Sequence, residues 1–155
     1  MQGENMQAEK IQNIGLELFS KLLKTFNQRA KDVTALFNDD AVIEYPYGAA
    51  LGGLSRYNKR EYADHLNAIM GQMPDISFSD IRVYPVSNSD SFWAEVHGEV
   101  VIPKTGKKYV QDYAMYFTVQ DNKFSFYREY WNPMAVLQAF GGLEAMQETL
   151  ENPNK

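Results

Sequence analysis

Apolar residues recur at helical spacing in the first half of the chain. Between residues 8 and 31, one face is formed by apolar side chains at Ile11, Ile14, Leu18, Leu22 and Phe26. This spacing predicts a long helix, followed by a short helix at residues 33–37 that Asp32 would cap. A further helix is predicted over residues 59–73. Asn58 would be its N-cap, Glu61 would complete a capping box, and Pro74 would end it.

The second half of the chain changes to the alternation that is typical of strands. Strands are predicted at residues 41–46, within 76–86, and at 92–102, 109–120 and 123–131. Asp121 and Asn122 suit a two-residue hairpin turn. Pro133 would open a helix at residues 134–140 that ends at Gly141. The sequence therefore predicts one α+β domain over residues 1–155, with frayed ends at about 1–6 and 151–155. Helices would cover one face of a curved antiparallel sheet.

The hairpin turn also predicts which side chains share a face of the last two strands. If Gln120 pairs with Lys123, strict alternation puts Glu129 on one face together with Ala114, Tyr116, Tyr127 and Trp131. The opposite face would carry Tyr113, Met115, Phe117, Val119, Phe124, Phe126, Arg128 and Tyr130. Because both faces are rich in apolar groups, we expect the helices to cover one of them. A second copy would cover the other, giving a homodimer through the outer sheet face.

Composition narrows the function classes. The chain has no cysteine, which excludes thiol catalysis and Cys-based zinc sites, and only 2 His, so no metal site is predicted. Its net charge of -5 argues against nucleic-acid and membrane partners. Neither a signal peptide nor a stretch of about 20 apolar residues is found, so a cytoplasmic location is expected. The 10 Tyr, 9 Phe and 2 Trp could form a core, an interface or an aromatic pocket.

Glu129 is the first candidate for chemistry. A carboxyl group surrounded by aromatic rings loses hydration, which raises its pKa and suits it to act as an acid or base. The alternative is a rim carboxylate that is paired with a lysine or with backbone amides. His65 is the second candidate, and it lies beside the stripe of Tyr62, Leu66 and Ile69 on the helix predicted at residues 59–73. Its alternative is a structural, hydrogen-bonded histidine.

Two further groups of residues are candidates for the wall of a pocket. Glu95, His97 and Glu99 alternate along one predicted strand. Side chains in such a row do not converge, so the pattern favours a polar face with local ion pairs over a metal site. Glu95, with Trp93 nearby, is the member that we expect to reach the pocket. Tyr45 is predicted to form a pocket wall just before Pro46.

Two segments resemble a known family. FNDDAVIEYP at residues 37–46 is similar to the opening of the SnoaL-like proteins, which belong to the nuclear transport factor 2-like and ketosteroid-isomerase-like superfamily. YREYWNP at residues 127–133 resembles the ending of SnoaL-like and phenazine-biosynthesis A/B proteins. The resemblance implies a cone-shaped, cystatin-like fold with a deep apolar pocket, usually dimeric, in a superfamily of isomerases, dehydratases, cyclases and non-catalytic binders.

The resemblance also bears on the site residues. In phenazine A/B proteins, the glutamate that corresponds to Glu129 contacts substrate, and a histidine points into the pocket beside a serine. This sequence has Ile69 at the serine position, and no arginine near residues 34–36. The leading hypothesis is therefore a cofactor-free protein that binds a hydrophobic molecule, with isomerase, dehydratase or cyclase chemistry at Glu129. The alternatives are a non-catalytic binding module and a phenazine-type condensation protein, so enzymatic activity stays open.

Overall fold

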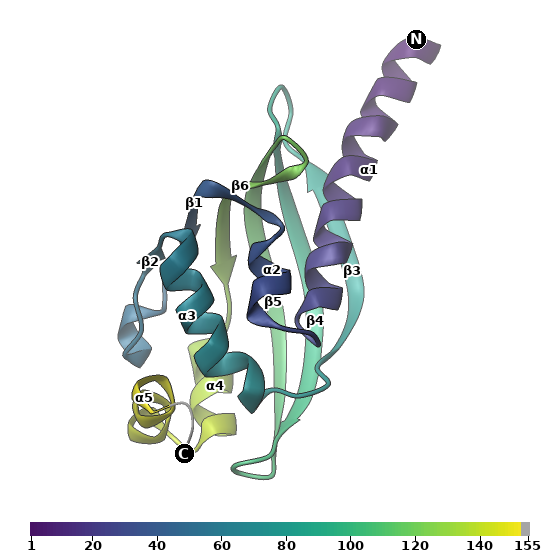
Figure 1. Ribbon diagram of the computed structural model, residues 1–155. Coiled ribbons are helices and arrows are strands. Elements are labelled where there is room, and N and C mark those ends of the chain that lie inside the picture. Colours follow the sequence, from purple (N-terminus) through teal and green to yellow (C-terminus); the bar gives the residue numbers. More distant parts are fainter. Residues whose placement is uncertain (153–155) are drawn as a thin grey trace.

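A curved six-stranded sheet, with strand order β2-β1-β6-β5-β4-β3, runs the length of the molecule (Figure 1). The structure is a computed structural model and describes residues 1–152. Its strands are β1 (Phe37–Glu44), β2 (Arg56–Tyr57), β3 (Ser77–Pro85), β4 (Ser91–Ile102), β5 (Lys107–Gln120) and β6 (Lys123–Tyr130). Neighbouring strands are antiparallel except for β1 and β6, which run parallel. The predicted antiparallel meander is formed by β3 to β6. Strand β1 adds a parallel pairing with β6, which is possible because these two strands lie far apart in the chain and are not joined by a hairpin.

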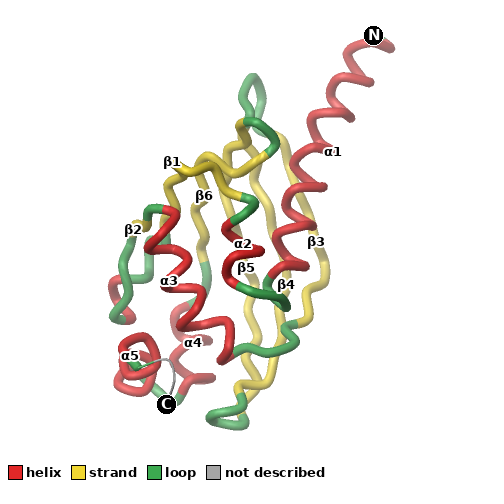
Figure 2. Tube along the Cα trace, in the orientation of Figure 1, coloured by secondary structure: helices red, strands yellow, loops and turns green. Residues whose placement is uncertain are grey.

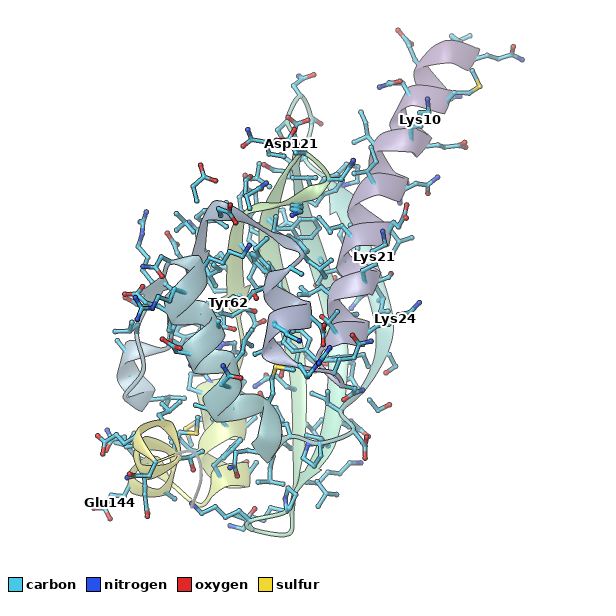
Figure 3. The ribbon with its side chains drawn as sticks, viewed as in Figure 1. Lys10, Lys21, Lys24, Tyr62, Asp121 and Glu144 are labelled. Carbon is cyan, nitrogen blue, oxygen red and sulfur yellow. The ribbon has the colours of Figure 1, made fainter. Side chains whose placement is uncertain are left out.

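Helices cover the inner face of the sheet (Figure 2). They are α1 (Gln2–Thr25), α2 (Ala30–Thr34), α3 (Lys59–Ile69), α4 (Pro133–Phe140) and α5 (Leu143–Glu151), with short 3-10 turns η1 (Ala49–Leu51) and η2 (Met70–Gln72). The first turns of α1 project past the sheet, and its lysines Lys21 and Lys24 point into solvent (Figure 3). The predicted α+β fold is confirmed. Residues 2–6, predicted to fray, form the first turns of α1, and residues 153–155 lie outside the described part.

The local signals in the sequence act as the patterns predict. Asn58 accepts a hydrogen bond from the Glu61 amide, and the Glu61 carboxylate accepts one from the Asn58 amide at 2.8 Å, which completes the capping box of α3. Asn132 caps α4, and Gly141 ends that helix at a φ of 93°. Asp32 differs, because it occupies the third position of α2 and accepts from the Arg29 amide instead of capping the helix.

The core has two parts. The first lies between the sheet and helices α1 to α3 and contains Phe19, Leu22, Phe37, Phe117 and Phe124, which are fully buried. The second surrounds the last helices and contains Ile102, Tyr109, Val136, Phe140 and Met146. Helix α5, which was not predicted, closes this end of the molecule (Figure 1). A cavity lies where the two parts meet, since residues of both line it.

Candidate functional site

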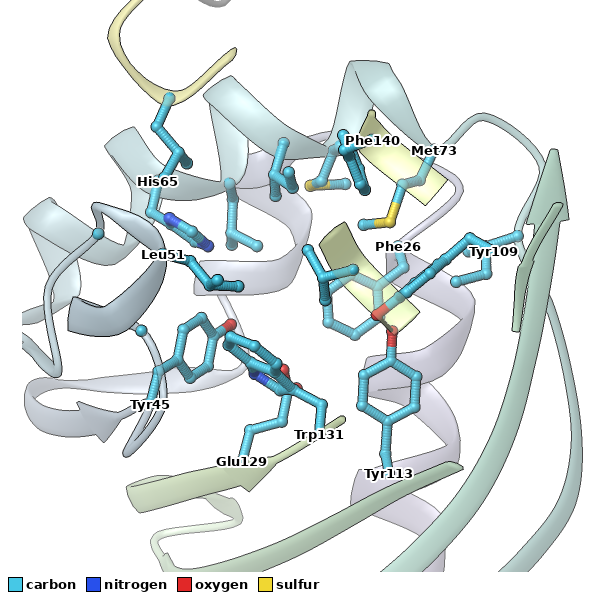
Figure 4. A pocket seen from close by; sticks show the side chains of 18 of the residues that line it. Phe26, Tyr45, Leu51, His65, Met73, Tyr109, Tyr113, Glu129, Trp131 and Phe140 are labelled. Carbon is cyan, nitrogen blue, oxygen red and sulfur yellow. Dashed lines mark hydrogen bonds between the residues drawn. The ribbon is translucent and has the colours of Figure 1, made fainter. Parts of the chain in front are cut away.

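Glu129 projects from β6 into the cavity and is only 8% exposed (Figure 4). The Tyr127 hydroxyl donates a hydrogen bond of 2.9 Å to Glu129 Oε1. Burial raises the pKa of the Glu129 carboxyl to about 7, although the bond from Tyr127 lowers it in part. Near neutral pH this carboxyl is therefore present in both protonation states, which is the condition that an acid–base group needs.

The neighbours of Glu129 differ from the prediction because of a β-bulge in β6. Thr118 pairs with Phe126 and Val119 pairs with Phe124, so Ser125 is an extra residue that interrupts the alternation. Met115 therefore lies opposite Glu129 on the inner face. The prediction that Tyr116 lies beside Glu129 is wrong, since its ring packs on Trp93 on the outer face of the sheet.

Because of the same bulge, part of the set predicted to form the interface lies on the inner face of the sheet instead. Phe117 and Phe124 are fully buried in the core, and Tyr113 and Met115 line the cavity. Phe126 and Tyr130 keep their place on the outer face, where Phe126 contacts Tyr116 and Tyr130 stacks on Trp93. One inserted residue thus exchanges the faces of about half of the predicted set.

The cavity has a volume of about 110 Å³ and a wall that is mainly apolar. Its wall is built from 23 residues: Leu23, Phe26, Tyr45, Gly48, Leu51, Gly53, Tyr57, His65, Leu66, Ile69, Met70, Met73, Ile76, Phe78, Tyr109, Tyr113, Met115, Glu129, Trp131, Val136, Phe140, Met146 and Leu150. Neither lysine nor arginine occurs among these described lining residues. The only side chains there with ordinary pKa values below 7 are Glu129 and His65, so the cavity suits an uncharged ligand.

His65 points into this cavity from α3 (Figure 4). Burial lowers the pKa of its imidazole to about 4, so the ring is neutral at physiological pH. Its Nδ1 lies 3.4 Å from the Tyr57 hydroxyl, which in turn accepts a hydrogen bond of 3.1 Å from the Leu54 amide. The ring of Tyr45 packs edge-on against the imidazole. These contacts hold His65 in one orientation toward the cavity.

Five other predicted pocket residues divide into two groups. Tyr45, Ile69 and Trp131 line the cavity, whereas Tyr62 is wholly buried in the first core part behind the wall. Tyr127 is likewise buried, and it reaches the site through its bond to Glu129. Burial, with the nearby Glu129 charge, raises the pKa of the Tyr45 and Tyr127 phenols well above the usual value, so both stay protonated.

Besides Tyr116, two predicted pocket residues lie outside the cavity. Trp93 is 41% exposed on the outer face, and Glu95 makes an ion pair of 3.4 Å with Arg82 there. The prediction that Glu95 reaches the pocket is wrong, because the inner positions of β4 belong to Phe92, Ala94 and Val96. His97 and Glu99 lie in the same outer row and contact each other at 3.2 Å.

Three groups of lining residues were missed at the level of sequence. Tyr109 lines the cavity and was not singled out, and Tyr113 was assigned to the wrong face. Helix α5 supplies Met146 and Leu150, and the spacing of Leu143, Met146 and Leu150 is a helical signal that could have predicted it. The Gly-rich segment before α3 contributes Leu51, which was not separated from its loop.

Among residues 1–152, no group of three or more histidine, aspartate or glutamate side chains is placed to hold a metal ion. Within that same range, none of the helices combines the length and the apolar character needed to cross a membrane.

Comparison with known proteins relates this geometry to other chains. The SnoaL-like domain pattern matches residues 19–127. An uncharacterized PhzA/B-like protein from Pseudomonas aeruginosa is 30% identical over 125 residues, which are 81% of this chain and 88% of that protein. The similarity to a PhzA/B-like protein agrees with the resemblance of residues 127–133.

Solved structures share the fold. A Bacillus subtilis crystal structure, named provisionally as an isomerase, has a TM-score of 0.78 and 29% identity, covering 84% of this chain and 94% of that one. A Catenulispora acidiphila protein with a ketosteroid isomerase-like fold has a TM-score of 0.67 and 11% identity, covering 81% of this chain and 93% of that one. At the latter identity, the likeness establishes a common fold alone.

Proposed function

This chain belongs to the SnoaL-like domain family, and we propose that it binds an uncharged, cyclic or aromatic small molecule and that Glu129 moves a proton on it. The observation that carries the proposal is one carboxyl group buried in the wall of an apolar cavity, with its pKa raised to about 7. Such a group can accept a proton from a weakly acidic carbon or oxygen and return it elsewhere.

Each neighbour has a distinct part in this proposal. Tyr127 holds the carboxyl in place through its bond of 2.9 Å. In this proposal the Tyr57 hydroxyl accepts from the Leu54 amide and donates to His65 Nδ1, which leaves the proton of the neutral ring on Nε2. His65 is then a hydrogen-bond donor that orients a ligand oxygen. The corresponding reaction is an isomerisation, dehydration or cyclisation without a cofactor.

The binding half is tested with a neutral fluorescent ligand. N-phenyl-1-naphthylamine should bind the purified protein with increased emission. Substituting Ile69→Asp, which puts a charge in the cavity wall, should weaken this binding at least 10-fold. Circular dichroism checks that the variant is folded. If the wild-type protein does not bind neutral aromatic compounds, the proposal fails.

The proton-transfer half is tested by hydrogen exchange at the acidic carbon of 2-tetralone in D₂O, followed by NMR. The wild-type protein should accelerate exchange, with a rate that rises with pH through about 7 as Glu129 ionises. Glu129→Gln should lose roughly 10²-fold or more of the acceleration. The matched control is Glu95→Gln, the same change on the outer face, which should behave as wild type. Ligand binding without accelerated exchange would favour the non-catalytic binding module.

The outer face supports a second proposal, namely that two copies associate there. Trp93 stacks on Tyr130 and packs edge-on against Tyr116. Phe126 packs edge-on against Tyr116, and the Arg128 guanidinium lies 5.1 Å from the Phe126 ring centre. Partly exposed rings with polar groups around them are typical of protein interfaces. Light scattering should give the dimer mass for the wild type and the monomer mass for Tyr116→Asp. A monomeric wild type would refute this association.

The phenazine-type condensation alternative has support in the PhzA/B-like relative from Pseudomonas aeruginosa. Against it stand the apolar Ile69 in the cavity wall and the lack of a cationic side chain among the described lining residues. The hypothesis with an uncharged ligand therefore agrees better with this cavity.

A further inference from the structure

A second polar group lies in the cavity wall, separate from Glu129. The hydroxyls of Tyr109 and Tyr113 are 3.2 Å apart, and both side chains point into the cavity from β5 (Figure 4). Met115 is the residue paired with Glu129. Tyr113 lies two residues and Tyr109 six residues from Met115, toward the N-terminus of β5. The two tyrosines therefore form a polar site at another part of the wall from the carboxyl.

Gln111 lies between these tyrosines on the same face and is 2% exposed. Its Oε1 accepts a hydrogen bond of 2.8 Å from the backbone N–H of Asn132, a group that can only donate. The orientation of the Gln111 amide is therefore determined, and its Nε2 is the atom that faces the Tyr109 hydroxyl at 3.1 Å. The same Nε2 also donates to the backbone carbonyl of Asn132 at 3.0 Å, so both Nε2 protons of Gln111 are in hydrogen bonds.

In the hydrogen bonds that link Gln111, Tyr109 and Tyr113, one tyrosine hydroxyl proton has no acceptor among the described residues. The Tyr109 oxygen accepts from Gln111, and one of the two tyrosines donates to the other. If Tyr109 donates, the Tyr113 proton has no acceptor among residues 1–152, and if Tyr113 donates, the same holds for the Tyr109 proton. In either arrangement the pair keeps one O–H group that can donate into the cavity.

The surroundings keep both phenols protonated, so the donor is present at neutral pH. Burial raises the pKa of the Tyr109 phenol to about 12 and that of Tyr113 well above its usual value, so both carry their protons at neutral pH. Phe140 packs edge-on against the Tyr109 ring, and Phe26 and Val136 line the same cavity. An unused donor in an apolar wall favours a ligand that supplies an acceptor oxygen.

We propose that Tyr109 and Tyr113 are the specificity-determining pair of this cavity, which donates one hydrogen bond to a carbonyl oxygen of the ligand. This inference rests on the proposed function and adds the class of ligand: cyclic or aromatic ketones rather than hydrocarbons of the same shape. Gln111 is a positioning residue, because it acts through Tyr109 and does not contact the ligand.

The test compares two probes of nearly the same shape, 2-acetylnaphthalene and 2-ethylnaphthalene, in fluorescence titrations. The measured quantity is the dissociation constant of the hydrocarbon divided by that of the ketone. This ratio should fall by roughly 2- to 10-fold in the double variant Tyr109→Phe/Tyr113→Phe, since a neutral hydrogen bond contributes about 1 kcal/mol. Each single variant still has one free phenolic proton, so it should keep a ratio close to that of wild type.

Two controls show that the loss is local. The double variant should bind 2-ethylnaphthalene at least as tightly as wild type does, because this probe loses no hydrogen bond, and such binding demonstrates an intact cavity. Tyr84→Phe makes the same chemical change at an exposed tyrosine of β3 and should leave the ratio unaltered. In addition, the infrared carbonyl band of bound 2-acetylnaphthalene should lie at lower frequency in wild type than in the double variant.

The outcomes separate this inference from the proposed function. If both probes bind wild type but the double variant keeps the same ratio and the same carbonyl frequency, the tyrosine pair does not select ketones. If neither probe binds wild type, the apolar cavity itself is not a ligand site, and the proposed function fails as well.

Discussion

Replacing Glu129 by glutamine should change the stability of the protein in a way that depends on pH. The carboxyl has an ordinary pKa of 4.5 and a folded-state pKa of about 7. Between these values the folded protein binds more protons than the unfolded chain does, so this group's contribution to the free energy of unfolding falls as pH rises. The contribution is fully present below pH 4.5 and is lost as pH rises through 7.

The magnitude follows from the same shift. One pKa unit corresponds to about 1.4 kcal/mol, so the ionised carboxyl costs the folded state about 3 kcal/mol at pH 8. Glutamine has nearly the same shape, can still accept the bond from Tyr127, and does not ionise. The difference in unfolding free energy between the variant and wild type should therefore grow by about 3 kcal/mol in favour of the variant between pH 4.5 and pH 8.

In the difference between the variant and wild type, the contributions of the other titrating groups cancel. His65 has the opposite effect, because its pKa is lowered from 6.5 to about 4 and its contribution to stability is lost as pH falls through that range. In wild type the two contributions offset each other in part, so wild-type stability alone would hide both. Both proteins keep His65, so its contribution cancels.

The assay is urea unfolding of both proteins at half-unit steps from pH 4.5 to 8.5, followed by tryptophan fluorescence. Glu95→Gln, at the exposed residue paired with Arg82, serves as the matched control and should show a difference below about 0.5 kcal/mol at every pH. A constant difference for Glu129→Gln across the whole range would mean that burial does not raise the pKa of the carboxyl. Glu129 would then be ionised throughout this range and could not act as an acid near neutral pH.

Three further predictions concern single residues. Tyr127→Phe removes the bond that lowers the pKa of Glu129, so an NMR titration of the labelled carboxyl should give a value above that of wild type; an unchanged pKa would refute this reason. Gly15→Ala should destabilise the protein by about 1–3 kcal/mol in urea, because the new Cβ would overlap the Phe92 ring, whereas Gly3→Ala meets no neighbour and should not destabilise it. Asn58→Ala removes the cap of α3 and should cost about 1 kcal/mol by the same assay, and no loss would contradict the capping box.

The sequence carried most of the fold because its signals are local. The capping box of Asn58 and Glu61, the turn at Asp121 and Asn122, and the start of α4 at Pro133 each depend on residues within a few positions of one another. Such patterns can be interpreted without knowing the rest of the chain. The parallel pairing of β1 with β6 joins distant segments and has no comparable local signal.

The candidate site was predictable only in part, for a related reason. Glu129 and His65 were singled out because a carboxyl among rings and a histidine beside an apolar stripe are visible in one dimension. The neighbours of Glu129 required the register of two strands, and the extra residue Ser125 shifts that register without any proline or glycine to signal it. Tyr116 and Tyr113 consequently exchanged faces.

The C-terminal helices have a consequence for how this protein could diversify. The family pattern ends at residue 127, whereas Val136, Phe140, Met146 and Leu150 close the cavity from α4 and α5. Gly141 and Gly142, both with positive φ, join these helices to each other. The shape of the cavity is thus set partly by two helices that follow the matched segment. Exchanging these two helices between relatives would change one side of the cavity wall and leave Glu129 on β6 in place.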